Sequence, residues 1–261
     1  MAYGRRYGSW RTSMKFRVLA ATAIALLFSV VANAAEIRVM STQAPEQAYR
    51  ALVPEFEKAS GHKVTTIFSG TVDINKRLAA GETYDVLIMA RPSIDEHTKS
   101  GKVVADSRVD LAKSGIVVAV RKGAPKPDIS TIEAFKKTLL AAKSIGYSTG
   151  PSGVYLVTLF QRLGITDEIK DKLKQTPTGI FVGSILTSGE VEIGLQQVSE
   201  LIAFPDCEII GPLPANIQQM TQFTASIMVD AKSVDAAKEW IKFLVSPAGA
   251  AAFKKTGMEP G

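Results

Sequence analysis

Short apolar runs alternate with amphipathic segments along this chain, and that alternation strongly narrows the folds open to it. The runs at residues 37–40, 63–68 and 85–90 have the length and the aliphatic or β-branched content of strands. Between the first two, the apolar residues from Tyr49 to Phe56 repeat at the spacing of one helix face. The run at 85–90 is almost entirely apolar, which predicts a strand buried on both faces of its sheet. Repeated strand and helix units of this kind predict an α/β fold with mostly parallel sheets.

The same alternation continues to the end of the chain. It predicts further strands at residues 116–121, 144–147, 191–195, 207–210 and 221–229. It predicts further helices around Ile74 and Leu78, at residues 131–142, at 154–163, near 180–187, and in two segments between 237 and 257. The pattern contains no internal repeat and no low-complexity linker.

Residues 1–34 have the pattern of a leader and are set apart from the fold. A basic stretch is followed by an apolar run at residues 18–31 and then by the small residues around Ala34. A helix needs about 20 apolar residues to span a bilayer, so this run is short for a membrane anchor. The pattern predicts a signal peptide cleaved near Ala34 and a periplasmic location, with either Met1 or Met14 as the start. The alternative is an uncleaved membrane anchor.

The net charge of +6 does not indicate a nucleic-acid partner. Of the 31 Lys and Arg residues, those at positions 5, 6, 11, 15 and 17 lie in the leader, which has no acid, so the remainder is close to neutral. A near-neutral body has no basic footprint for DNA, RNA or an anionic membrane surface.

The residues needed for metal or catalytic chemistry are few. Cys207 is the single cysteine, which excludes an intramolecular disulfide. His62 and His97 are the two histidines, and both have polar neighbours that predict solvated surface positions. The sequence has no phosphate-binding loop, dinucleotide fingerprint, zinc-protease helix or nucleophile elbow. We therefore expect no metal and no cofactor.

Three predicted turns share one composition. Each follows a strand, is rich in hydroxyls or glycine, and opens a helix: Ser41 and Thr42 in the first, Ser69, Gly70 and Thr71 in the second, and Ser148, Ser152 and Gly153 in the third. The free N–H groups and the dipole of a helix start attract anions. In an α/β sheet such turns lie at the carboxyl ends of the strands, where ligands bind. The alternative is that these hydroxyls only cap their helices.

Four segments carry a resemblance to a known family. Residues 39–42, 64–70 and 84–90, with the ending at 236–257, resemble the periplasmic molybdate-binding proteins of ABC importers. The resemblance implies a type II periplasmic binding protein fold, with two α/β lobes joined by two crossing strands. The lobes are expected at residues 35–115 plus 225–261 and at 116–224, with crossings near 114–122 and 219–229.

The resemblance also implies a function and a set of site residues. Ser41 and Ser69 match ligand-binding hydroxyls of the family, and Ser152 precedes Gly153 where the family commonly has Tyr-Gly. Gln197, after Gln196, stands where the family usually has Tyr. The implied function is a monomeric solute-binding protein that traps an oxyanion of the molybdate or tungstate type, or an organic di- or tricarboxylate, for an inner-membrane ABC permease.

Arg91 follows the strand at 85–90 directly, at the end that faces the expected cleft. Its planar guanidinium suits a carboxylate, which favours an organic di- or tricarboxylate. The alternative for Arg91 is a solvated position on the rim.

The resemblance extends to aconitate isomerases, which implies a second possible function, interconversion of cis- and trans-aconitate. Proton transfer of this kind needs a base near the reacting carbon. The candidates are Glu200 and Tyr147, with Tyr155 nearby. The alternative is that these side chains are structural.

Overall fold

The computed structural model describes residues 1–4 and 34–261. The predicted signal peptide therefore lies almost entirely outside the described residues. Residues 34–261 form one compact unit, which is described below. None of the helices in this described part is long and apolar enough to span a membrane.

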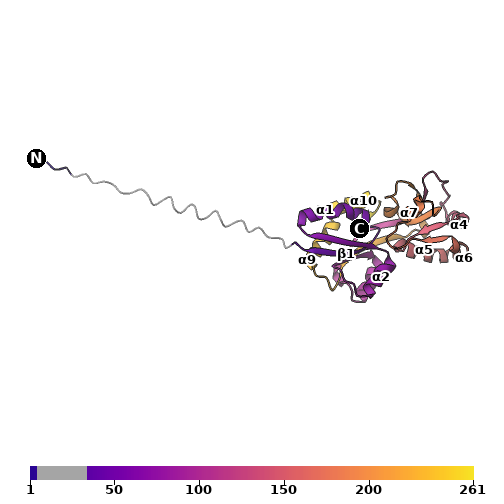
Figure 1. Ribbon diagram of the computed structural model, residues 1–261, viewed down its shortest axis with the longest axis horizontal. Coiled ribbons are helices and arrows are strands. Elements are labelled where there is room, and N and C mark those ends of the chain that lie inside the picture. Colours follow the sequence, from indigo (N-terminus) through magenta and orange to yellow (C-terminus); the bar gives the residue numbers. More distant parts are fainter. Residues whose placement is uncertain (5–33) are drawn as a thin grey trace. The chain divides into compact units, whose positions relative to one another are not determined.

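Strands and helices alternate as the sequence predicts (Figure 1). The strands are β1 (Glu36–Thr42), β2 (Lys63–Ser69), β3 (Val86–Ala90), β4 (Val109–Arg121), β5 (Ile145–Tyr147), β6 (Leu173–Gln175), β7 (Ile193–Gln197), β8 (Cys207–Pro212), β9 (Met220–Ile227) and β10 (Glu259–Pro260). The helices are α1 (Glu46–Ser60), α2 (Thr71–Ala79), α3 (Arg91–Lys99), α4 (Ile132–Ala141), α5 (Pro151–Arg162), α6 (Thr166–Ile169), α7 (Val182–Thr187), α8 (Val198–Leu201), α9 (Val234–Leu244) and α10 (Pro247–Lys255).

The strands lie in the order β2-β1-β3-β9-β4-β7-β5-β6, with β8 and β10 also paired to β4. Parallel pairs join β1 to β2 and β3, and β5 to β6 and β7. The antiparallel pairs among the described strands all involve β4 or β9. We call β1, β2, β3, β9, β10 and their helices α1, α2, α3, α9 and α10 the first half, and β5 to β8 with α4 to α8 the second half.

The apolar run of β3 supplies two cores at once, because successive side chains of a strand point to opposite faces. Val86 and Ile88 pack with α1, α9 and α10 on one face of the sheet. Leu87 and Met89 pack with α2 and α3 on the other face. The first half is therefore a sheet covered by helices on both faces, as the continuous apolarity of this run predicts.

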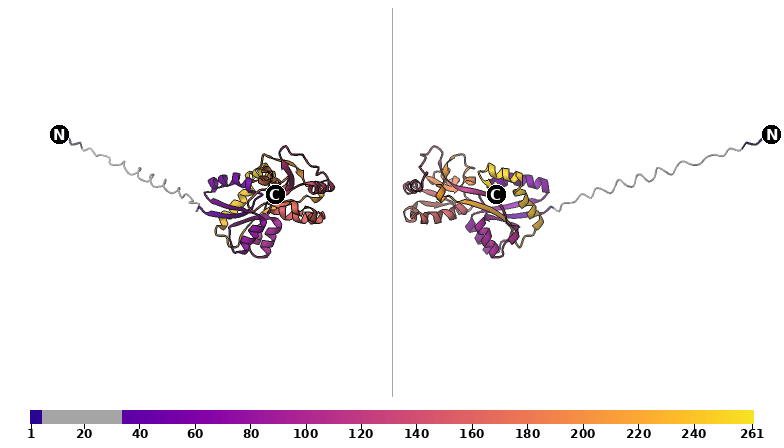
Figure 2. Two further views of the ribbon diagram at one scale, coloured as in Figure 1. Left: turned by 45° about the vertical axis from the view of Figure 1, so that its right-hand side comes forward. Right: turned by 180° about the vertical axis from the view of Figure 1, so that it is seen from behind.

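The second half repeats this arrangement around its own cores. Phe135 of α4 and Leu156 of α5 pack with Ile145 and Leu195 of the sheet. Leu186 of α7 packs on the other face, together with α8. Helices α1 and α9 of the first half and α4 and α6 of the second half lie toward opposite ends of the described body (Figures 1 and 2).

Strand β4 joins the halves. Its residues from Val109 to Gly115 pair with β9 in the first half. Its residues from Ile116 to Arg121 pair with β7 and β8 in the second half. The α/β fold of two halves with two crossing strands is thus confirmed, whereas the residue boundaries of the two lobes stay a prediction.

Several elements differ from the sequence prediction. The short elements α6, α8, β6 and β10 were not predicted. Helix α3 was not expected either, because RPSIDEHTK is polar on nearly every side and buries only Ile94. Strand β4 begins at Val109 rather than near residue 116, since Asp110, Lys113 and Ser114 interrupt the apolar pattern of its first part. The polar residues in this part of β4 make side-chain bonds described below.

The prediction for His62 is wrong. Its side chain is buried, at 8% exposure, and its ring packs against Phe56. Its Nδ1 atom accepts a hydrogen bond from the backbone N–H of Ala35 at 3.1 Å. Its neighbours in the sequence, Gly61 and Lys63, do not reveal that this histidine packs at the edge of the core.

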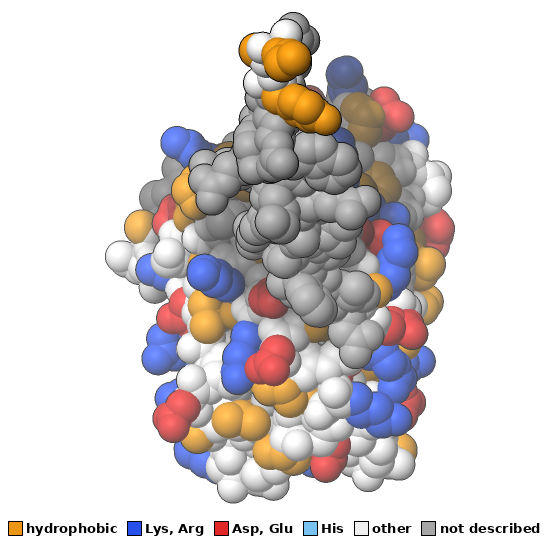
Figure 3. All heavy atoms as spheres, turned by 90° about the vertical axis from the view of Figure 1, so that its left-hand side faces the viewer, with side chains coloured by type: hydrophobic (Ala, Val, Ile, Leu, Met, Phe, Trp, Pro, Cys, Tyr) orange, Lys and Arg blue, Asp and Glu red, His pale blue; other side chains and the backbone are white. Residues whose placement is uncertain are grey.

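Lys and Arg side chains alternate with acidic side chains on the face shown in Figure 3. The described charges visible there form a mixed surface. This distribution agrees with a body of nearly balanced charge.

Candidate functional site

The first two turns lie side by side at the carboxyl ends of β1 and β2. In the parallel register Thr42 pairs with Ser69. Ser41, Thr42 and Ser69 are buried. The hydroxyl of Ser41 donates to the carbonyl oxygen of Thr42 at 2.9 Å, and that of Ser69 donates to Asp73 at 2.6 Å.

The third turn, from the second half, meets the second turn. A β-carbon placed on Gly70 would lie 2.2 Å from Oγ1 of Thr149. A β-carbon on Gly153 would lie 1.7 Å from the carbonyl oxygen of Ser148, so α5 starts directly against the end of β5. Glycine at position 70 lets the two halves approach closely, and glycine at position 153 lets α5 approach the end of β5. The sequence did not single out Thr149, although it lies within the third turn.

The helices that begin at these turns have no side-chain cap. The N-cap residues are Pro45 for α1, Gly70 for α2 and Gly150 for α5, and none of them accepts a cap hydrogen bond. Thr131 and Ser246, by contrast, cap α4 and α10 through their hydroxyls. The Ser148 hydroxyl accepts a hydrogen bond from the N–H of Gly150, just before α5, at 3.2 Å. None of the turn hydroxyls accepts from the N–H groups inside the first turns of α1, α2 and α5.

Four buried hydroxyls without a hydrogen-bond partner lie at or just after strand ends. Thr42 is the last residue of β1, Thr71 opens α2 after β2, Thr176 follows β6 and Ser199 lies in α8 after β7. In the described part of the chain the hydroxyl of each is buried and unpaired. An unpaired buried polar group needs a physical explanation, and a bound anion is an acceptor for any of these hydroxyls that face it. The sequence missed Thr176, because the short strand β6 carries little apolar signal.

The two glutamines are engaged inside the protein. The side-chain oxygen of Gln196 accepts from the N–H of Val182 at 2.9 Å, and its nitrogen donates to Glu200 at 2.9 Å. Gln197 lies where the crossing strands meet: its nitrogen donates to the carbonyl oxygen of Ser114 and its oxygen accepts from the hydroxyl of Thr221, both at 2.9 Å. Their expected contact with a ligand stays a prediction.

Glu200 is a buried acid in α8, with 4% of its surface exposed. Burial raises the pKa of Glu200 to about 8, and the nearby carboxylate of Glu46 contributes in the same direction. Glu46 belongs to the first half and accepts hydrogen bonds from Arg50. Burial also raises the pKa of Tyr147 above its ordinary value. Glu200 can therefore carry a proton near neutral pH, unlike an ordinary carboxyl group.

A groove of about 530 Å³ runs between the halves beside the second turn. Thr71 and Arg91 line it from the first half, Pro151 and Tyr155 from the second, and residues 219–222 from the crossing segment. The structure thus places Arg91 and the second turn in the lining of one groove. This agrees with the prediction that Arg91 faces a cleft. The Tyr155 hydroxyl donates to the carbonyl oxygen of Ile217, just before this crossing segment, at 2.7 Å.

No group of three His, Cys, Asp or Glu side chains among residues 1–4 and 34–261 is arranged to hold a metal ion. The expectation that no metal or cofactor is used stays a prediction.

Comparison with known proteins adds the following relationships. Residues 37–259 match the family described as bacterial extracellular solute-binding protein. Aconitate isomerase from a Pseudomonas species is 37% identical over 230 residues, which cover 86% of this chain and 87% of that protein. The molybdate-binding protein ModA of Azotobacter vinelandii is 25% identical over 239 residues, which cover 88% of this chain and 92% of that protein.

The solved structure of the Azotobacter vinelandii periplasmic molybdate-binding protein aligns with a TM-score of 0.70 at 20% identity, over 85% of this chain and 98% of that chain. This likeness shows a shared fold. The two halves and their crossing strands are those of a type II periplasmic binding protein.

Proposed function

This chain belongs to the bacterial extracellular solute-binding protein family, and on that premise we propose that it traps a small anion where its two halves meet. The carrying observation is the contact between Gly70 and Thr149, which brings the uncapped starts of α2 and α5 together. Helix starts attract negative charge with about 0.3 to 1 kcal/mol each. The unpaired hydroxyls of Thr42 and Thr71 add neutral donors at the same strand ends.

The proposal includes a place of action and a partner. After removal of residues 1–34 the protein acts as a monomer in the periplasm and delivers its anion to the inner-membrane permease of an ABC importer. Supporting this, a relative at 25% identity is named as a molybdate-binding protein, and the basic, apolar and small-residue stretches of the leader have the pattern of a secretion signal.

A panel of anions tests the binding proposal. At a ligand concentration 100 times its Kd, binding stabilises a protein by about 2.7 kcal/mol, which for a chain of this size raises Tm by about 5 to 10 °C. Purified protein is heated with molybdate, tungstate, sulfate, phosphate, citrate, cis-aconitate or trans-aconitate. We expect at least one of these anions to raise Tm by that amount. An unchanged Tm with every anion would contradict the proposal.

A second candidate function is isomerisation of aconitate. It is favoured by the 37% identical relative named aconitate isomerase and by the buried Glu200, whose pKa is raised to about 8. In the reaction a base removes a proton from the carbon beside the double bond, the double bond shifts, and a proton returns to the other end of the allylic system. No atom is gained or lost. A group with a pKa near the working pH can both accept and return that proton.

An isomerisation assay separates the two candidates. Purified protein is incubated with cis-aconitate, and the trans isomer is followed by proton NMR. If the protein is an isomerase, conversion is catalytic and Glu200→Gln abolishes it while leaving aconitate binding in place. Binding without conversion by the unaltered protein would remove the isomerase and leave the binding function.

A further inference from the structure

Arg91 gives the groove between the halves a positively charged side chain, and this charge indicates the class of ligand. We propose that Arg91 forms a second subsite that accepts a distal carboxylate, that Asp110 competes for the same guanidinium, and that the ligand is therefore an organic anion with at least two carboxylates. This inference rests on the proposed anion site and extends it from one negative group to two.

The groove connects the two subsites. Thr71 lies at the start of α2, and its unpaired hydroxyl belongs to the neutral donors described above. Arg91 begins α3 and lines the same groove. Asp95 is the acidic residue among the lining side chains, and it is already ion-paired with Arg108. Arg91 is thus the charged side chain of this lining best placed to receive an anionic group.

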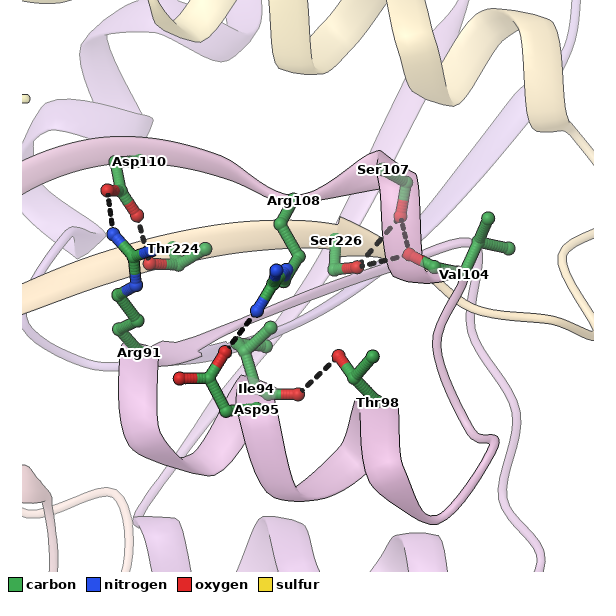
Figure 4. A network of polar contacts seen from close by, with 10 residues as sticks. All are labelled: Arg91, Ile94, Asp95, Thr98, Val104, Ser107, Arg108, Asp110, Thr224 and Ser226. Atoms are coloured by element: carbon green, nitrogen blue, oxygen red, sulfur yellow. Dashed lines mark hydrogen bonds and ion pairs between the residues drawn. The ribbon is translucent and has the colours of Figure 1, made fainter.

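The contacts of Arg91 allow an exchange of partners. Its Nη1 atom donates to Oδ2 of Asp110 at 2.7 Å, and 52% of its side chain is exposed. The other oxygen of Asp110 accepts from the hydroxyl of Thr224 at 2.6 Å. Figure 4 shows this arrangement, with Arg91 reaching from α3 toward Asp110 on β4 and Thr224 on β9. When Arg91 turns to a ligand, Asp110 keeps its bond to Thr224.

The ion pair also stands between two hollows. Arg91 lines the groove and a second hollow of about 300 Å³, whereas Asp110 and Thr224 line only this second hollow. The guanidinium can therefore turn from Asp110 toward the groove by rotation of its own side chain. A guanidinium binds a carboxylate through two parallel hydrogen bonds, which is a stronger contact than one exposed ion pair.

This arrangement distinguishes ligand classes. A tetrahedral oxyanion is compact and is satisfied by the neutral donors at the helix starts, without reaching Arg91. A dicarboxylate or tricarboxylate can place one carboxylate among those donors and another on Arg91. Ligands with two separated carboxylates should therefore gain affinity from Arg91, and single tetrahedral anions should not.

Titration calorimetry with defined probes tests the subsite. The probes are sulfate and molybdate as tetrahedral anions, and succinate, citrate and trans-aconitate as polycarboxylates. We expect Arg91→Ala to weaken the tightest-binding polycarboxylate by about ten- to hundred-fold. Binding of a tetrahedral anion should change by less than about two-fold.

The competition by Asp110 gives a test in which affinity increases. Asp110→Asn keeps an acceptor for Thr224 and removes the charge that holds Arg91. We expect this variant to bind polycarboxylates more tightly, by up to about five-fold. In the Arg91→Ala background the same change should have no effect. This double-mutant cycle separates competition for Arg91 from a general change in charge.

Lys126→Ala is the matched control, because Lys126 forms an exposed ion pair with Glu208 and neither residue lines the groove or the second hollow. It should leave every affinity unchanged, and the Tm of each variant without ligand confirms folding. Equal effects of Arg91→Ala on both probe classes, no effect of Asp110→Asn, or a Lys126→Ala effect as large as that of Arg91→Ala would overturn the inference. If tetrahedral anions bind and polycarboxylates do not, the inference fails and the proposed function stands. If no probe binds, the proposed function fails as well.

Discussion

Glu200 illustrates how one residue's surroundings decide its chemistry. Its carboxyl group accepts a hydrogen bond from the side-chain nitrogen of Gln196 and is repelled by the negative charge of Glu46. Burial raises the pKa of Glu200 to about 8. The sequence offers Glu200 as a candidate base but does not reveal its raised pKa, since burial depends on how α8 packs in the fold.

The raised pKa predicts a pH dependence of stability. An acid whose pKa is higher in the folded than in the unfolded protein takes up a proton on folding between the two values. The free energy of unfolding therefore falls as pH rises from about 4.5 to about 8, by up to about 1.4 kcal/mol per unit. Urea unfolding across this range should show the decline in the unaltered protein and a flatter profile in Glu200→Gln. Identical profiles would show that Glu200 titrates normally.

The unpaired hydroxyl of Thr71 predicts opposite effects on stability and binding. Thr71→Val removes a buried donor that has no partner, so the free energy of unfolding without ligand should rise by about 1 kcal/mol. Anion affinity should fall by about ten-fold, because a hydrogen bond to a charged group is lost. Both quantities are measured, by urea unfolding and by titration calorimetry.

Thr66→Val is the matched control for Thr71→Val. The hydroxyl of Thr66 is also unpaired, but Thr66 lies within β2 and away from the turns. It should stabilise the protein without changing anion affinity. A stable Thr71→Val protein with full affinity would remove this hydroxyl from the site.

At the scale of elements, apolar periodicity predicted most strands and helices because each buries a regular stripe or face. It failed where an element is polar. Helix α3 buries little beyond Ile94, and the first part of β4 carries Asp110 and Lys113. Helix α3 carries Arg91 and β4 carries its ion-pair partner Asp110. The polar residues that interrupt the apolar pattern of these elements are therefore the ones that make these side-chain contacts.

The meeting of the second and third turns predicts a pair of variants with opposing effects. Gly70 has φ −76° and ψ 153°, which alanine also adopts, so Gly70→Ala acts only through its β-carbon. That carbon clashes with Thr149 and should weaken anion binding at least about ten-fold by holding the halves apart. Adding Thr149→Gly should restore most of the affinity, as titration calorimetry of the single and double variants would reveal.

Gly150→Ala serves as the control for the turn contact. A β-carbon on Gly150 meets Oγ of Ser148 at 3.4 Å, an ordinary contact. Affinity should stay near that of the unaltered protein. Failure of Thr149→Gly to rescue Gly70→Ala would mean that the two turns do not approach each other when the anion binds.

At the scale of the whole molecule, the order of strands and helices was enough to predict two α/β halves with crossing strands. The proposed location of the site followed from a general rule, that helix starts and ligands lie at the carboxyl ends of parallel strands. What the order could not give is the distance between turns of different halves, because it depends on where β4 changes partners at Gly115 and Ile116. Thr149 was missed for that reason, whereas Thr176 was missed because the short strand β6 before it was not predicted.

The central claim is that a negatively charged group binds between α2 and α5, where backbone N–H groups and hydroxyls from both halves donate to it. The most direct measurement is X-ray diffraction from crystals grown with the anion that raises Tm most. We expect density for one anion within hydrogen-bond distance of the first N–H groups of α2 and α5, next to Thr71. An anion bound elsewhere on the protein, with the turns of Gly70 and Thr149 in contact with each other but not with it, would contradict the claim.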